Sequence, residues 1–106
     1  MWSVKYLPEF EKDFRSLGRN EVILVRKAIQ KVAQNPLPKS QGGYGNPLGN
    51  KGGKNLTGLL KIKLKGLGIR IVYKLEKTEK GMLIIVIGAR ADNEVYELAS
   101  KRINKI

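Results

Sequence analysis

The residues that could carry chemistry in this chain are lysine, arginine and tyrosine, because histidine and cysteine are both absent. Histidine is the usual general acid or base near neutral pH, and zinc sites are built mostly from cysteine and histidine. Asp13 and Asp92 are the only aspartates, and the glutamates are scattered along the sequence. A metal held by carboxylates is therefore not expected. We expect neither a metal nor a cofactor, and any catalysis must use cationic groups, tyrosine or an isolated carboxylate.

Two neighbouring segments, residues 60–65 and 69–75, alternate between apolar and polar residues. A period of two is typical of strands that bury one face. Pairing apolar residues with one another across a hairpin sets Leu64 opposite Ile71 and leaves Leu67-Gly68 as a two-residue turn. In this register five cations share one face of the predicted sheet: Lys61, Lys63, Lys65, Arg70 and Lys74.

This register also sets Lys65 opposite Arg70 and Lys61 opposite Lys74. Like charges directly opposite each other destabilise a sheet by a few tenths of a kcal/mol or more. Lysines on one strand alone could simply protect a solvated face or a sheet edge, but the cations of the second strand favour a binding role. Alternate residues lie about 6.6 Å apart along a strand, which is comparable with the phosphate spacing of an extended nucleic-acid strand. The pattern predicts a surface that binds RNA phosphates.

The overall charge agrees with a polyanionic or acidic partner. Lysine and arginine number 21 against 9 acidic residues, so the formal net charge is +12. Self-repulsion on this scale disfavours a compact state unless a partner neutralises it. The lack of cysteine gives no indication of secretion, and no segment approaches the roughly 18 apolar residues of a membrane span. We therefore expect a cytoplasmic protein that does not bind a membrane.

The elements that must position these residues fit one domain over residues 1–106. Residues 82–87 are nearly all apolar, which predicts a strand covered on both faces. Asn20 is the predicted N-cap of the second helix. We expect an α+β fold in which two N-terminal helices pack on a small, mainly antiparallel sheet, with a helix at the C-terminus. Apolar spacing predicts these three helices at residues 9–17, 21–34 and 92–106.

Residues 35–58 are rich in glycine, proline and asparagine, with the sequence NPLPKSQGGYGNPLGNKGGKNLTG. They do not have the GxxxxGK[ST] spacing of a nucleotide-binding P-loop. A long segment of this composition predicts a mobile loop, and we expect it to hold basic side chains near a partner. The sequence leaves the role of Tyr44 open. The basic residues of the predicted loop are Lys39, Lys51 and Lys54.

The segments LKIKLKGLGIRIVY and VIGARADNEVYELASKRI resemble the RelE branch of the RelE/ParE superfamily, the toxins of type II toxin–antitoxin modules. The resemblance is close over about residues 59–104, while the N-terminal helices match only in order and length. It implies an endoribonuclease that cleaves messenger RNA in the ribosomal A site, in contact with ribosomal RNA. It also implies a cognate antitoxin that wraps the basic surface and folds on binding, in a complex that forms a higher-order hetero-oligomer.

The resemblance also implies roles for individual residues. Lys61 and Lys63 match lysines that hold the scissile phosphate, and Arg70 matches an arginine that stabilises charge in the transition state. Arg90 matches the proposed general acid for the leaving 5′ oxygen. Tyr96 matches a tyrosine that stacks on the nucleotide and has been assigned as general base, a role that could instead belong to Lys63. The residues expected to bind RNA outside the chemical step are Lys65, Lys74, Lys51 and Lys54.

The implied reaction is attack of a 2′-hydroxyl on the adjacent phosphate, which gives a 2′,3′-cyclic phosphate and a free 5′-hydroxyl without a metal. Lysine and arginine would mainly stabilise charge, because their reference pKa values of about 10.4 and above 12 make them poor acids and bases. Ile69 and Ala89 replace an aromatic residue and a lysine of the best-known family member, so rate or codon preference could differ.

Two alternatives stay open at this point. A ParE-like toxin that inhibits gyrase would have the same fold, although Arg90 and Tyr96 together argue against it. A non-catalytic module that binds nucleic acid would need only the lysine-bearing face.

Overall fold

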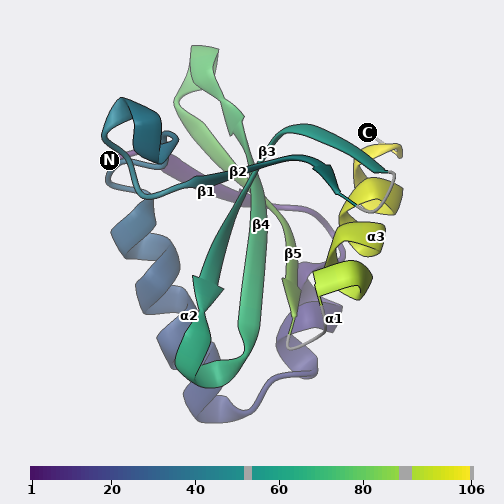
Figure 1. Cartoon of the computed structure of the whole chain (residues 1–106). Coiled ribbons are helices and arrows are strands. Elements are labelled where there is room, and N and C mark those ends of the chain that lie inside the picture. The colour runs from purple at the N-terminus through teal and green to yellow at the C-terminus, as the bar shows by residue number, and fades with distance from the viewer. Residues whose placement is uncertain (52–53, 89–91, 106) are drawn as a thin grey trace.

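The computed structural model describes residues 1–51, 54–88 and 92–105, and excludes the side chains of residues 50, 51, 54, 92 and 93. The described residues form a five-stranded sheet in the order β1-β5-β4-β3-β2, with helices on both faces (Figure 1). β1 runs parallel to β5, and the other neighbouring strands are antiparallel. The predicted α+β architecture is confirmed. Its elements are β1 (Ser3–Tyr6), α1 (Phe10–Arg15), α2 (Arg19–Val32), β2 (Asn46–Lys51), β3 (Lys54–Leu64), β4 (Ile69–Glu76), β5 (Gly81–Gly88) and α3 (Asp92–Ile103).

The helices follow their predicted apolar spacing, with small shifts at their ends. In α2, Val25, Ile29 and Val32 are buried against the sheet, as expected for residues at i, i+4 and i+7. The predicted cap at Asn20 is wrong, because α2 begins two residues earlier. Gly18 is the N-cap, and its backbone N–H donates a hydrogen bond of 2.7 Å to the Glu21 carboxylate. This is the return half of a capping box. No helix in the described part of the chain is long and apolar enough to cross a membrane.

The register between β3 and β4 differs from the prediction by two residues. Ile62 pairs with Ile71 and Lys63 with Arg70, so the predicted two-residue turn is wrong. A 3-10 turn over Lys65–Leu67 joins the strands instead, and Gly68 closes it at φ +65°. Glycine reaches this left-handed conformation without steric cost, and the longer turn moves every pair. A shift of two keeps each side chain on its predicted face, so the predicted faces are confirmed.

The sheet buries an apolar core on each face. Tyr73 of β4 lies with Val25 and Ile29 of α2 in the core that also contacts α1. Val72, the preceding residue, points to the opposite face and lies in the core beneath α3, with Val95. Because β4 is covered on both sides, its apolar residues alternate between two cores. This arrangement sets α3 over the same face of β3 and β4 that carries the cations.

A β-bulge in β5 shapes the core beneath α3. The pairing of β5 with β4 shifts between Val72 and Tyr73, so Ile85 is an extra residue in β5. A bulge of this kind breaks the alternation of side chains. As a result the adjacent residues Ile85 and Val86 both lie in the core beneath α3, while Ile87 lies in the core on the opposite face. The prediction of a strand covered on both faces is confirmed.

The prediction of one structureless loop over residues 35–58 is wrong in its second half. Asn46–Lys51 forms the edge strand β2, and β3 begins at Lys54 rather than Leu59. The strand β1 was also missed. β1 alternates between polar and apolar residues but has only four of them, which is too few to establish a period. β2 lacks such an alternation and has an irregularity in its pairing between Pro47 and Gly49, and backbone pairing leaves no mark on the side-chain pattern.

Tyr73 should make the stability of the fold depend on pH in the alkaline range. It is fully buried, its hydroxyl donates a hydrogen bond of 2.7 Å to the Pro36 carbonyl, and burial raises the pKa of that hydroxyl. The neutral form stabilises the fold fully below the unfolded pKa of about 10, and this contribution is lost as pH rises above it. Urea unfolding between about pH 9 and 11 should show a loss of up to about 1.4 kcal/mol per pH unit from this group. Tyr73→Phe should lack that component, and identical slopes in both proteins would contradict the prediction.

Candidate functional site

A lysine of the sheet and a tyrosine of the C-terminal helix meet on the α3 side of the sheet. The Lys61 ammonium of β3 donates a hydrogen bond of 2.8 Å to the Tyr96 hydroxyl of α3. The same ammonium lies 5.5 Å from the centroid of the Tyr96 ring. Tyr96 is 7% exposed and packs with Val95 and Ala99 in the core beneath α3. Packing therefore fixes the ring, and Lys61 orients its hydroxyl.

Two further cations lie beside this contact. Lys63 is two residues along β3 from Lys61, and it pairs directly with Arg70 of β4. Lys63 is exposed, while Arg70 is half-buried and donates a hydrogen bond of 3.1 Å to the Gly68 carbonyl. Directly opposite residues have Cβ atoms about 4.5–5.5 Å apart, and alternate residues of a strand are about 6.6 Å apart. Three positive groups and a phenol therefore share an area comparable with one phosphodiester and its neighbours.

The predicted face of five cations is smaller than expected. Lys65 belongs to the turn after β3 rather than to the strand. Lys61 pairs with Val72, not with Lys74, and Lys74 pairs with Leu59. Lys74 therefore lies diagonally across from Lys61 on the same face, and the residues directly opposite these two lysines, Leu59 and Val72, are buried beneath α3. The predicted pairs of Lys65 with Arg70 and of Lys61 with Lys74 are therefore wrong.

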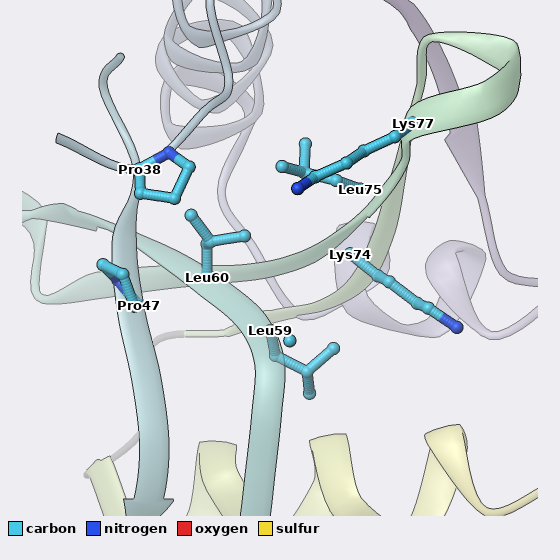
Figure 2. Close-up of a pocket in the computed structure, with 8 residues that line it drawn as sticks. Pro38, Pro47, Leu59, Leu60, Lys74, Leu75 and Lys77 are labelled. Carbon is cyan, nitrogen blue, oxygen red and sulfur yellow. The ribbon is translucent and has the colours of Figure 1, made fainter. Parts of the chain in front are cut away.

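Lys74 instead lines a separate, mostly apolar cavity of about 530 Å³. Figure 2 shows Lys74 and Lys77 at the β4 side of this cavity, across from Pro38 and Pro47. The floor includes Leu60, which belongs to the other core. The cavity therefore lies at the end of the sheet remote from the turn after β3.

Three of the predicted site residues cannot be placed in the same way. Arg90 lies outside the described residues, and so do the side chains of Lys51 and Lys54. Gly88, which precedes Arg90 by two positions in the sequence, pairs with Arg70 across β5 and β4. Roles for Arg90, Lys51 and Lys54 stay predictions.

The structure also contains a buried ion pair that the sequence reasoning missed. The Arg102 guanidinium of α3 binds both carboxylate oxygens of Asp13 of α1, at 2.7 and 3.0 Å. It also donates to the Ile85 carbonyl at 2.9 Å, while the Ile87 N–H donates to Asp13 at 2.9 Å. The pair thus binds backbone groups of β5 at the edge of the sheet, beyond the end of β1. It fixes α3, which carries Tyr96, to α1 and β5.

A signal for this pair was present in the sequence. Asp13 falls on the apolar stripe of its helix, with Phe10 and Phe14. Arg102 likewise falls at i+7 from Val95 and i+3 from Ala99 on the apolar stripe of α3. A charged residue on an apolar stripe indicates a buried partner.

Known proteins with similar sequences and structures agree with this fold. The mRNA interferase toxin RelE of Escherichia coli K12 is 29% identical over 92 residues, which cover 87% of this chain and 86% of that protein. The free structure of an Escherichia coli RelE variant with two arginines replaced by alanine has a TM-score of 0.74 and 25% identity, covering 96% of this chain and 97% of the other. The same variant in complex with a peptide of antitoxin RelB has a TM-score of 0.68 and 26% identity, covering 95% and 96%. No family model matches the chain. In sequence and in fold, the chain is similar to RelE toxins.

Proposed function

We propose that this chain is the toxin of a type II toxin–antitoxin module and that it cleaves messenger RNA on the ribosome. The similar Escherichia coli protein is named an mRNA interferase toxin, which supports a toxin that acts on messenger RNA. The observation that carries the proposal is the contact between Lys61 and Tyr96. It joins the lysine-bearing strand to a group with a removable proton, and such a pairing is not needed for binding alone.

The proposed reaction begins with attack of a ribose 2′-oxygen on the adjacent phosphorus. The bond from phosphorus to the 5′ oxygen breaks, leaving a 2′,3′-cyclic phosphate and a 5′-hydroxyl. Tyr96 or Lys63 takes the proton of the 2′-hydroxyl, and Arg90 gives a proton to the leaving oxygen. Lys61 and Arg70 stabilise the additional negative charge on the phosphate oxygens, and such preorganised charges are usually a large part of catalysis. The reaction in this form balances without a metal ion.

The burial of Tyr96 bears on its proposed role. A ring that is 7% exposed has little surface on which a nucleotide could stack. Its hydroxyl, by contrast, is held by Lys61 next to the other cations. We therefore favour a role through the hydroxyl, and stacking would first require α3 to uncover the ring.

The ribosome and an antitoxin are the proposed partners. Lys, Arg and Tyr are weak acid–base groups, so much of the rate must come from an RNA held in the reactive geometry. The ribosomal A site, with its ribosomal RNA, would supply that orientation. A cognate antitoxin is supported by the complex of the similar RelE variant with an antitoxin peptide. It should carry an acidic or amphipathic segment that neutralises the net charge of +12, in a cytoplasmic hetero-oligomer.

Primer extension on messenger RNA after brief induction of the protein tests the proposal. We expect cuts inside translated codons, and no cuts in the same message when its start codon is destroyed. Growth arrest without cuts would favour inhibition of gyrase. Binding to RNA with neither arrest nor cuts would favour a non-catalytic module.

A further inference from the structure

A second basic surface lies between α2 and the C-terminal end of β3. It is a cavity of about 290 Å³ whose floor includes the apolar residues Val32 and Ile62. Tyr44 lines it from the segment between α2 and β2. We call this cavity the Tyr44 groove. Its lysines come from α2, from the turn that follows and from β3: Lys31, Lys39 and Lys63.

Tyr44 presents an aromatic ring to solvent beside a cation. The residue is 46% exposed, and the Lys31 ammonium lies 5.5 Å from the centroid of its ring. An aromatic platform flanked by lysines is the arrangement by which proteins hold single-stranded nucleic acid, with bases on the ring and phosphates on the cations. The groove therefore combines both parts of such a site.

The backbone that carries Tyr44 is fixed by close packing. Its N–H donates a hydrogen bond of 3.0 Å to the Asn35 carbonyl. A side chain at Gly43 would collide with the Leu37 backbone, and one at Gly45 would collide with the Tyr73 hydroxyl. The glycines on either side of Tyr44 are thus required by close approach rather than by flexibility. Because this backbone is already fixed, ligand binding costs little backbone entropy at Tyr44.

Lys63 connects the groove with the site around Lys61. The register of β2 with β3 reaches Asn46 and Lys61, so Lys63 lies beyond the last of these pairs. It lines the groove and also pairs with Arg70 of β4. The groove lies on the α2 face, with Val32 and Ile62, and the cationic site lies on the α3 face. A strand of RNA whose scissile phosphate lies at Lys61 and Arg70 would therefore pass Lys63 around the edge of β3 and enter the groove with its neighbouring nucleotide.

We propose that the Tyr44 groove is a binding subsite for one nucleotide of single-stranded RNA adjacent to the scissile phosphate. The base stacks on Tyr44, and Lys31 and Lys39 bind phosphates on either side of it. The inference that the bound strand is also the strand that is cleaved rests on the proposed function. The binding itself does not, because it requires neither the ribosome nor cleavage.

Fluorescence anisotropy with a labelled single-stranded RNA of about ten nucleotides tests this subsite, using full-length protein that carries Arg90→Ala so that it can be produced. Tyr44→Ala should weaken binding about tenfold, as loss of one stacked base does. Tyr44→Phe should stay within about twofold, because it keeps the ring. Neither change should alter the dependence of affinity on salt.

Replacing the groove lysines, unlike replacing Tyr44, should change the salt dependence of RNA affinity. Lys31→Gln with Lys39→Gln should reduce the slope of log affinity against log salt by about 1.4, since each phosphate contact on a single strand contributes about 0.7. The matched control, Lys12→Gln with Lys101→Gln, removes two exposed lysines from α1 and α3 and should leave this slope within about 0.3 of the parent.

Several results would overturn the subsite. These are unchanged RNA affinity in Tyr44→Ala, equal losses in Tyr44→Ala and Tyr44→Phe, or an equal loss toward inorganic polyphosphate, which has no bases. If the Tyr44 and lysine variants lose antitoxin binding but keep their RNA binding, the groove would be assigned to a protein partner instead. Cuts in messenger RNA together with RNA binding that is independent of Tyr44 would reject the groove alone. Binding that depends on Tyr44 without such cuts would reject the nuclease and keep the groove.

Discussion

Replacing Asp13 with alanine should lower the free energy of unfolding by about 3–5 kcal/mol, because it leaves the Arg102 charge buried without its partner. Both side chains are 9% exposed, and the guanidinium binds the carboxylate through two hydrogen bonds. The change also removes the acceptor of the Ile87 N–H, and an unsatisfied buried donor has its own cost. Single domains are typically stable by about 5–15 kcal/mol, so this is a large fraction of the total. Urea unfolding monitored by circular dichroism measures it.

A double change of the buried ion pair and a single change in an exposed ion pair supply the controls. Combining Asp13→Leu with Arg102→Met should be less destabilising than either change alone, since no unpaired charge is left in the core. Glu11→Ala removes an exposed pair with Arg15 in the same helix and should cost about 0.5 kcal/mol or less. A loss in Asp13→Ala no larger than that of Glu11→Ala would contradict the assigned role of the buried pair.

Tyr96→Phe should lower the rate of messenger RNA cleavage by about 100-fold or more, in the range found when one preorganised catalytic group is removed. The phenylalanine ring can still pack against Val95 and Ala99, so the change removes the hydroxyl and little else. Lys61→Met, which removes the ammonium that binds this hydroxyl, and Arg90→Ala should have effects of similar size. Single-turnover cleavage on ribosomes programmed with a defined message measures the rate apart from product release.

Binding and folding must be measured beside the rate. Tyr96→Phe should retain affinity for the ribosome and the melting temperature of the parent protein within a few degrees. Lys12→Gln, which removes an exposed lysine on α1, should leave cleavage unchanged. Full cleavage activity in both Tyr96→Phe and Arg90→Ala would remove the basis for the assigned site.

The sequence predicts the faces of the central strands better than their pairing. A period of two decides which side chains share a face, so the alternation alone is enough to group Lys61, Lys63 and Arg70. Pairing depends on the turn, and the sequence does not reveal that Gly68 ends a 3-10 turn in the left-handed conformation. The predicted register was therefore wrong by two residues, which paired Lys61 with Lys74 and placed Lys65, a turn residue, opposite Arg70.

The sequence pattern does not predict contacts between elements that are far apart in the chain. Arg102 and Asp13 are 89 residues apart, and Tyr96 and Lys61 are 35 apart. Each of these pairs depends on how α3 packs on the sheet, which no local spacing determines. The role of Tyr96 came from the resemblance to RelE, whereas its burial and its contact with Lys61 came only from the packed fold.

The bulge in β5 has a consequence for how the length of this chain can vary. Deleting Ile85 would keep the pairs of β5 with β4 on either side of the bulge and would leave Val86 and Ile87 on their present faces. The loss would be one isoleucine side chain beneath α3 and the carbonyl that accepts a hydrogen bond from Arg102. A deletion within β3 is different, because it would turn Lys61 and Lys63 toward the opposite core. Among related chains, one-residue differences in strand length should therefore gather at the bulge, where the cationic site is left intact.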